Sequence, residues 1–297
     1  MSTGIVVVGD LVTDVLVAHV GPIELGSDTD AAITVSGGGQ AANTAAWLAH
    51  AGHEVTLVAA VGDDLAGRER VAELTAAGVR CAVRAHPGAV TGSVVVLAGP
   101  HERTMITDRG AALLLDPDDV RAAVESASHL HLSGYPLLHE GSRPGGLAAL
   151  QKAAGRTTSV DAASAAPLRS VGASAFLAWV RDVDLLLCNA DEADVLAGAG
   201  PAAEQARRLT EHVRNAVVKQ GPAGATWASR DGHLHSVAPQ RVRRMKDPTG
   251  AGDAFAAGLL AAWCAGAAPE ASLTAGARLG AEAVGQIGAR PRQLFSS

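Results

Sequence analysis

Short apolar runs rich in β-branched residues alternate with alanine-rich helical stretches along most of this chain. Among these runs are GIVVVGD near the N-terminus, then EVTLVAAVG, VDLLLCN and NAVVKQG. Such alternation is typical of strand–helix–strand units, so it predicts a mainly parallel sheet with helices on both faces. Several runs are apolar throughout, as expected of strands that are buried on both sides. The sequence therefore predicts a doubly wound α/β fold.

Polar residues follow several of these predicted strands. Asp10 and Asp14 come after the first strand, Asn189 follows VDLLLC, and Lys219 follows NAVV. Ligands of doubly wound sheets bind at the carboxyl ends of the strands. We therefore expect these side chains to lie at the binding site.

Two segments, 15–35 and 91–110, interrupt the alternation. They contain strand-like runs joined by turn residues, with no helix between them. We interpret them as a small antiparallel β-sheet inserted into a single domain that spans 1–297. Because an added sheet beside the ligand edge can close over a substrate, we expect it to be a lid.

Composition excludes several classes of partner. The 297 residues are 48% hydrophobic, which is enough for a sizeable core, whereas a net charge of −6 and 3% aromatic residues argue against nucleic-acid binding. Three widely spaced cysteines predict neither a disulfide framework nor a zinc site. The N-terminus lacks the pattern of a signal peptide, and the most apolar segment, 254–268, is shorter than a membrane span. We expect a cytoplasmic protein with no membrane partner.

The stretch DPTGAGDAF, residues 247–255, places three small residues between two carboxylates. It could simply start a helix with a capping side chain. Glycine in a first turn, however, costs roughly 1 kcal/mol relative to alanine, which indicates that something approaches this backbone closely. In the functional interpretation, the amides of Gly250, Ala251 and Gly252 hold an anion such as phosphate, and Asp253 lies beside it.

Three further motifs each have a structural and a functional interpretation. SGGGQAAN, residues 36–43, is either a glycine turn before a helix or a site where a small ligand lies against the backbone and bonds to Asn43. Asp14 is either a solvated turn residue or a carboxylate that accepts hydrogen bonds from two adjacent sugar hydroxyls. In NADE, Asn189 and Glu192 either start a helix or hold a phosphate oxygen and a hydrated magnesium ion. The chain contains neither a P-loop nor a G-x-G-x-x-G fingerprint.

Taken in order, these motifs resemble those of the ribokinase-like (PfkB) family of carbohydrate kinases. The resemblance covers nearly the whole chain and rests on GDLVTD, GGGQAAN, VGDDLAG, TG at Thr91, ERT at Glu102, NADE, VVKQGPAGA and DPTGAGDAF. It implies a doubly wound sheet with a β-sheet lid, ATP as donor, Mg²⁺, and a hydroxyl of a small sugar-like molecule as acceptor.

The resemblance also implies roles for individual residues. Asp253 is the base facing the acceptor hydroxyl, and the three amides of the loop before it hold charge on the phosphoryl group. The other implied positions are Asp14, Gly38, Gly39 and Asn43 for the acceptor; Asn189, Lys219, Gly221 and Gly224 for the nucleotide; Glu192 for magnesium through water; and Asp247 and Thr249 for a monovalent cation such as K⁺.

This sequence departs from the ribokinase pattern at several positions. Gln40 and Ala41 stand where ribokinases proper carry lysine and glycine, which argues against ribose as acceptor, and Pro248 stands where threonine is more usual. Arg103, in the second lid segment, either reaches an acidic substrate or is a solvated charge.

The leading hypothesis is an ATP-dependent kinase of a sugar or sugar acid. A nucleoside kinase of the same family is the alternative, and its base would need a wall such as Tyr135 or Trp47. A non-catalytic sugar-binding regulator would have no use for Asp253 and the loop glycines, and a dinucleotide-dependent oxidoreductase would need the missing fingerprint. We also expect a homodimer through the lid, because its apolar runs need burial and relatives often pair there.

Overall fold

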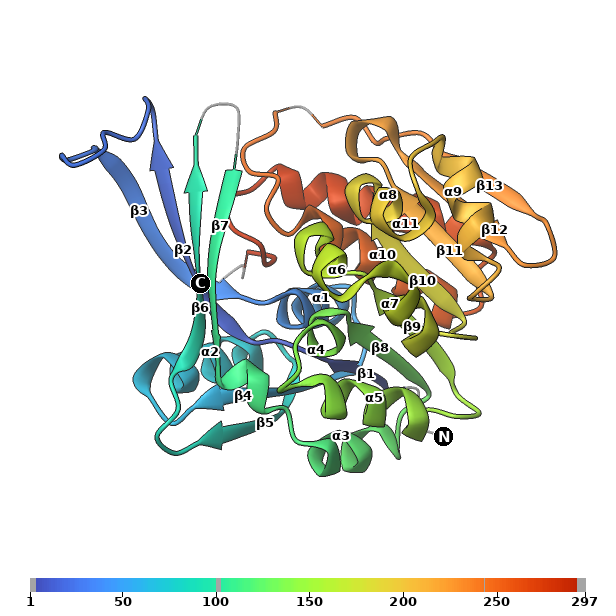
Figure 1. Cartoon of the computed structure of the whole chain (residues 1–297), viewed down its shortest axis with the longest axis horizontal. Coiled ribbons are helices and arrows are strands. Elements are labelled where there is room, and N and C mark those ends of the chain that lie inside the picture. The colour runs from blue at the N-terminus through green and yellow to red at the C-terminus, as the bar shows by residue number, and fades with distance from the viewer. Residues whose placement is uncertain (1–3, 100–102, 243, 293–297) are drawn as a thin grey trace.

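The main sheet has nine strands in the order β13-β12-β11-β10-β9-β8-β1-β4-β5 (Figure 1). The computed structural model describes residues 4–99, 103–242 and 244–292. All neighbours from β11 to β5 are parallel, and β12 and β13 are added antiparallel at one edge. The strands are β1 (Ile5–Val8), β4 (Val55–Gly62), β5 (Arg80–His86), β8 (His129–Ser133), β9 (Thr157–Asp161), β10 (Leu185–Asn189), β11 (Asn215–Lys219), β12 (Ala225–Ser229) and β13 (Leu234–Val237).

Helices cover both faces of this sheet, as predicted. On one face lie α1 (Gln40–His50), α2 (Leu65–Ala76), α10 (Ala251–Cys264) and α11 (Pro269–Val284). On the other lie α3 (Pro117–Val124), α4 (Tyr135–Leu138), α5 (Arg143–Lys152), α6 (Ala165–Val171), α7 (Ala173–Trp179), α8 (Ala190–Ala197) and α9 (Ala202–Leu209). Short 3₁₀ turns, η1 (Ala111–Leu114) and η2 (Gly221–Ala223), complete the elements.

Strand β1 shows why these apolar runs form a central sheet. Val6 and Val8 are buried in the core under α3, whereas Ile5 and Val7 are buried in the core under α1 and α10. Because successive side chains of a strand point to opposite faces, a strand between two helical layers must be apolar at every position. Among the described residues, none of the helices combines the length and apolar character that crossing a membrane requires.

The direction of the chain across the sheet reverses at β1. From β1 the chain runs through β4 and β5 on one side, and later through β8, β9, β10 and β11 on the other. The crevice at such a switch point, beyond the carboxyl ends of the strands, is where ligands of doubly wound sheets bind. Gly9, which follows β1, has no room for a Cβ, since that atom would overlap the side chains of Ala41 and Ser133. The chain is therefore packed tightly at the floor of this crevice.

A second sheet has four strands in the order β3-β2-β6-β7 and stands beside the main domain (Figure 1). Its strands are β2 (Val12–His19), β3 (Ala31–Gly38), β6 (Thr91–Ala98) and β7 (Arg103–Gly110). The outer pairs are antiparallel, as predicted, but the central pair of β2 and β6 is parallel. Both central strands leave the same carboxyl edge of the main sheet, after β1 and after β5, and therefore run in the same direction. We call this sheet the lid.

Candidate active site

Asp253 and Asn43 meet where two helices begin. Asn43 lies in the first turn of α1 and Asp253 in the first turn of α10, and Asn43 Nδ2 donates a hydrogen bond of 2.9 Å to Asp253 Oδ2. Burial raises the pKa of Asp253 to about 8, although the hydrogen bond from Asn43 and the charge of Lys219 act in the opposite direction. A carboxylate with such a pKa can accept a proton near neutral pH.

The loop before α10 has the conformation that its glycines allow. Gly250 adopts φ of 76°, and a Cβ there would overlap the carbonyl of Ala289. The amide of Ala251 donates to the carbonyl of Pro248 at 3.2 Å, whereas those of Gly250 and Gly252 have no partner within the described part of the chain. Two of the three predicted anion-binding amides thus remain available.

Asp247 and Thr249 stabilise this loop from within. Asp247 Oδ1 accepts hydrogen bonds from the amide and the hydroxyl of Thr249, at 2.9 and 2.6 Å. Asp247 Oδ2 accepts from the amide of Gly288, in the segment that follows α11. The side chain of Asp247 therefore ties the loop to the C-terminal segment.

Lys219 reaches the same loop from the end of β11. Its Nζ lies 2.5 Å from Asp161 Oδ2, and a Cβ on Gly252 would lie 3.6 Å from this ammonium group. Burial alone would lower the pKa of Lys219, but the carboxylates of Asp161 and Glu192 raise it above its ordinary value, so the side chain stays charged. A buried positive charge and two unpaired amides form a donor set that suits a phosphoryl group.

Asp161 and Gln40 belong to the site but are absent from the sequence-based assignment. Asp161 Oδ1 accepts from Gln40 Nε2 at 3.0 Å and from the amide of Ala163 at 3.1 Å, and Gln40 Oε1 accepts from Ser133 Oγ at 2.6 Å. Asp161 ends β9, so the strand-end rule that selected Lys219 also applied to it. The sequence marks Gln40 only as a departure from ribokinases, whereas in the structure this side chain joins α1 to the ends of β8 and β9.

The predicted acceptor side lies at the base of the lid. Asp14 is in β2, and its carboxylate occupies the space that a Cβ on Gly38 would need. Gly39 adopts φ of 100° directly before α1, and a Cβ there would lie 2.5 Å from the carbonyl oxygen of Asp10. Burial raises the pKa of Asp14 to about 6, with the charge of Arg290 opposing the shift. Gly39 is therefore required by its backbone conformation and by the carbonyl beside it, whereas the missing side chain of Gly38 makes room for the Asp14 carboxylate.

Asp10 and Arg109 form a buried ion pair next to the acceptor side. Arg109 Nη1 lies 3.2 Å from Asp10 Oδ2, and both side chains are at least nine-tenths buried. The Arg109 guanidinium also lies 3.7 Å from the ring centroid of Tyr135, while His139 stacks on the same ring. Trp47 is fully buried and donates to the carbonyl of Ala289 at 2.9 Å. The Arg109 guanidinium therefore covers one face of the Tyr135 ring, and Trp47 has no exposed face.

On the predicted nucleotide side, Asn189 and Glu192 form a capping box at the start of α8. The two carboxylate oxygens of Glu192 accept from the amide and the side chain of Asn189, at 2.8 and 2.7 Å. Glu192 is buried, which raises its pKa to about 7.

The capping interpretation is confirmed, and a role of Glu192 in magnesium binding would require an intervening water. Residues 4–99, 103–242 and 244–292 contain no group of three or more His, Cys, Asp or Glu side chains arranged for a metal ion.

The other predicted nucleotide residues lie next to this cap. Lys219 is the register neighbour of Asn189 in the pairing of β10 with β11. Gly221 and Gly224 bound the 3₁₀ turn after β11, and Gly224 needs to be glycine because a Cβ would overlap the carbonyl of Val237. Arg103 begins β7, but its side chain lies outside the described residues.

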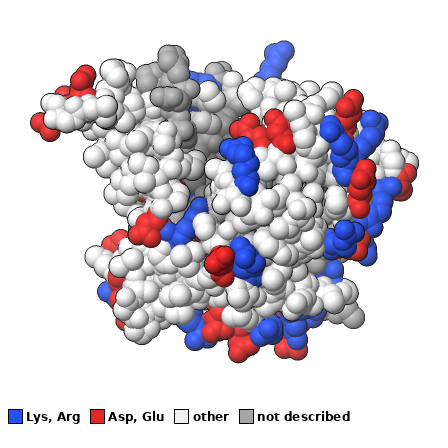
Figure 2. All heavy atoms as spheres, in the orientation of Figure 1, with Lys and Arg blue, Asp and Glu red and all other residues white. Residues whose placement is uncertain are grey.

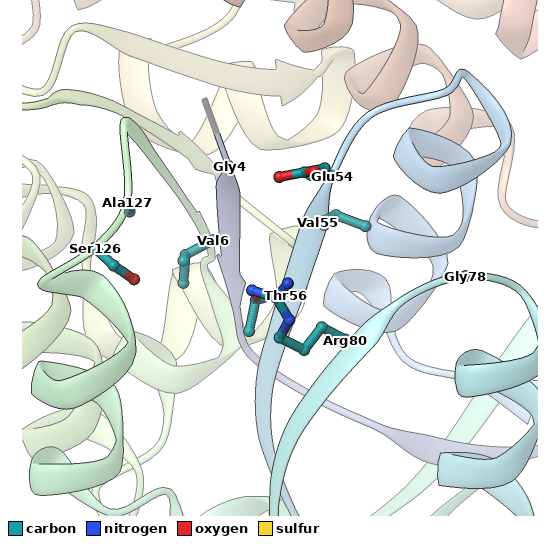
Figure 3. A pocket seen from close by; sticks show the side chains of 9 residues that line it. All are labelled: Gly4, Val6, Glu54, Val55, Thr56, Gly78, Arg80, Ser126 and Ala127. Atoms are coloured by element: carbon teal, nitrogen blue, oxygen red, sulfur yellow. The ribbon is translucent and has the colours of Figure 1, made fainter. Parts of the chain in front are cut away.

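Figure 3 shows a pocket at the opposite edge of the main sheet, where β1 and β4 begin. Side chains of Glu54, Thr56 and Arg80 line it, together with the turn at Ser126 and Ala127. None of the predicted site residues contributes to this pocket. It lies at the amino ends of the strands, away from the edge where such sheets bind their ligands.

Sequence comparison finds relatives along nearly the whole chain. The family model for pfkB family carbohydrate kinases matches residues 2–294. The chain is 30% identical to the 2-dehydro-3-deoxygluconokinase of Thermoproteus tenax, covering 84% of this chain and 80% of that protein. It is 27% identical to the adenosine kinase of Saccharomyces cerevisiae, covering 84% and 78%.

Solved structures share the fold. The adenosine kinase of Sinorhizobium meliloti superposes with a TM-score of 0.88 at 24% identity, covering 98% of this chain and 96% of that chain. The ribokinase of Arabidopsis thaliana, solved with ribose and ATP, superposes with a TM-score of 0.78 at 22% identity, covering 97% and 95%. The predicted ribokinase-like architecture is thus confirmed.

Proposed function

The chain belongs to the pfkB family of carbohydrate kinases, and we propose that it transfers the γ-phosphoryl group of ATP to a hydroxyl of a small sugar or sugar acid. One observation carries the proposal: Asp253, the Lys219 ammonium and the unpaired amides of Gly250 and Gly252 converge at one edge of the sheet. Kinases of this family are phosphotransferases with an alcohol acceptor and use ATP and Mg²⁺.

Each of these groups has a distinct part in the proposed reaction. Asp253 accepts the proton of the acceptor hydroxyl as that oxygen attacks phosphorus. Lys219 and the loop amides offset the charge on the phosphoryl group, because a loose transition state needs alignment and charge stabilisation rather than covalent help. These donors are already fixed by Asp161 and by the turn, so little reorganisation is required.

Metal ions would support the same reaction. Bound Mg²⁺ would neutralise charge on the phosphates, and Glu192 would hold it through water while Asn189 meets a phosphate oxygen. A monovalent cation such as K⁺ near Asp247 and Thr249 would anchor the loop, a role that only the family resemblance supports.

The acceptor is proposed to be a sugar or sugar acid on structural grounds. The Arg109 guanidinium covers one face of the Tyr135 ring and Trp47 is in the core, which disfavours stacking of either ring on a nucleobase. The 2-dehydro-3-deoxygluconokinase relative supports a sugar acid. The yeast adenosine kinase relative keeps a nucleoside kinase as the second candidate.

A coupled assay of ADP release, run with MgATP and panels of pentoses, ketohexoses, sugar acids and nucleosides, separates these candidates. We expect turnover with a sugar or sugar acid. Turnover confined to nucleosides would overturn the acceptor class. Sugar binding with no turnover for any acceptor would indicate a non-catalytic regulator.

Replacing Asp14 with alanine should mainly raise the acceptor KM. Loss of the carboxylate would leave one or two substrate hydroxyls unpaired, at a cost of roughly 1 to 3 kcal/mol. This cost corresponds to an increase of about 5-fold to 150-fold in the acceptor KM. The KM for ATP should change less than twofold, since Asp14 lies in the lid strand β2. Asp28→Ala, at an exposed position between β2 and β3, is the matched control. Equal weakening of ATP and acceptor binding would show that Asp14 is not in the acceptor subsite.

We also propose that the lid forms a homodimer interface. Cross-strand register places seven apolar side chains on the face opposite Asp14, and Ile33, Val35 and Ile106 in this set are 65%, 61% and 58% exposed. Below its tip, the lid surface in Figure 2 has few charged side chains. An apolar face and two open strand edges are covered most simply by a second copy. The face comprises Val15, Val17, Ile33, Val35, Val95, Leu97 and Ile106.

Light scattering at micromolar concentration tests this interface. The wild-type protein should be a dimer, and Ile33→Glu should convert it to a monomer because a charge would be buried between the two sheets. Thr34→Glu lies on the opposite face of the same strand and should leave the dimer intact. A wild-type monomer, or a dimer that survives charged substitutions at Val15, Val17 and Ile33, would show that this face is not the interface.

A further inference from the structure

Arg290 follows α11, and its side chain donates three hydrogen bonds beneath the lid. Its Nε donates to Asn43 Oδ1 at 3.2 Å, its Nη2 donates to the carbonyl of Gly38 at 2.9 Å, and its Nη1 donates to Glu73 Oε2 at 3.3 Å. The Arg290 side chain is 14% exposed. One guanidinium thus links the C-terminal segment to α1, to the end of β3 and to α2.

The contact with Asn43 fixes the direction of its carboxamide. A carboxamide has one oxygen, which accepts, and one nitrogen, which donates. Because the oxygen of Asn43 accepts from Arg290, its nitrogen faces Asp253. The reversed amide would place two sets of N–H donors against each other and an oxygen against a carboxylate.

The chain makes room for Arg290. A Cβ on Gly37, the first glycine of the SGGG motif, would overlap the guanidinium. The neighbouring residue, Ala289, packs against Gly250 and accepts the indole N–H of Trp47. The segment that carries Arg290 is therefore held against both the anion-binding loop and α1.

We propose that Arg290 is a positioning residue for the phosphoryl transfer: it holds the Asn43 carboxamide so that its N–H group donates to the base. The proposal rests on the role of Asp253 as base. Arg290 contacts Asn43 on the side away from Asp253 and acts on the reaction through that side chain.

A pH profile reports this role. Burial is the main cause of the raised pKa of Asp253. The groups that face it are Asn43 from α1, Asp161 from β9, Lys219 from β11 and Asp10 after β1; the two carboxylates raise this pKa further, and the amide and the ammonium lower it. Removal of Arg290 frees the amide to turn, so the pKa of Asp253 should rise. Only the deprotonated carboxylate accepts a proton, so the acid limb of the activity profile should move to higher pH.

The experiment compares kcat/KM for the acceptor from pH 6 to 10 in wild-type protein, Arg290→Gln and the control Arg292→Gln, an exposed arginine two residues further along. If the pKa of Asp253 rises by about one unit, kcat/KM of Arg290→Gln should be about tenfold below the wild-type value at pH 7 and within about threefold of it at pH 9.5. Arg292→Gln should follow the wild-type curve. An unchanged Arg290→Gln profile, or an equal loss at every pH, would overturn the proposal.

Two further variants keep the test decisive. Because the charge of Arg290 also lowers the pKa of Asp14, the variants are compared in an Asp14→Asn background. There Arg290→Gln should still shift the acid limb, and once Asn43→Ala is added it should cause no additional shift, because the carboxamide through which it acts is gone. If Arg290→Gln does not fold, Arg290→Lys keeps the charge but replaces the two fixed nitrogens that donate to Asn43 and Gly38 with a single ammonium nitrogen. It should shift the acid limb in the same direction. A wild-type profile with no acid limb would instead contradict the role of Asp253 as base.

Discussion

Replacing Asp253 with asparagine should lower kcat by about a hundredfold to ten-thousandfold, the usual contribution of one acid–base group. The substitution keeps the shape of the side chain and an oxygen that can accept from Asn43, so binding of ATP and acceptor should change little. Steady-state kinetics gives kcat, and calorimetry gives the two affinities. A variant that retains more than a third of the wild-type kcat would contradict the assignment.

The matched control for this variant is Asp118→Asn. Asp118 also lies in the first turn of a helix, α3, but it is exposed and remote from the site. Both substitutions replace a carboxyl group in the first turn of a helix with an amide of the same shape. Only the Asp253 variant should lose turnover, which separates loss of the base from loss of helix stability.

Replacing Lys219 with methionine should lower kcat by about a hundredfold to a thousandfold, the effect expected when one fixed donor to the transition state is removed. The Lys219 ammonium lies beside Gly252, whose amide is proposed to bind the phosphoryl group during its transfer. The loss should therefore appear mainly in kcat and less in the KM for ATP. A kcat within threefold of the wild-type value, or a change confined to the KM for ATP, would place Lys219 on the nucleotide rather than on the transferred phosphoryl group.

The Lys219 variant also leaves Asp161 without its ion-pair partner. A buried, unpaired carboxylate is destabilising, so the thermal midpoint of unfolding should be recorded for each variant. Lys219→Met combined with Asp161→Asn removes that unpaired charge and should recover stability without recovering kcat. Lys152→Met, at a surface lysine paired with Glu125, should affect neither quantity.

The sequence was sufficient for the main architecture because each strand between two helical layers must be apolar at every position. It could not show that β2 and β6 run parallel, since their direction depends on where both strands leave the main sheet. The role of Gly37 was also hidden: its missing side chain makes room for Arg290.

The residues of the site also differ in whether a local sequence pattern could predict them. The strand-end rule identified Asp10, Asn189 and Lys219 as residues of this edge, and it applied equally to Asp161. Arg290 could not be found in this way, because it is 247 residues away from Asn43 and its role depends on how α11 ends. Contacts over such distances in the chain have no local pattern.

We propose that this site moves a phosphoryl group from ATP to an acceptor hydroxyl, with Asp253 as the base. Mass spectrometry of the acceptor, combined with an ADP assay of the same reaction, tests it most directly. We expect one phosphorylated acceptor for each ADP released by the wild-type protein, and both products to form at least about a hundredfold more slowly with Asp253→Asn. ADP release that is independent of the acceptor, or phosphorylation by the Asp253 variant at more than a third of the wild-type rate, would contradict this role.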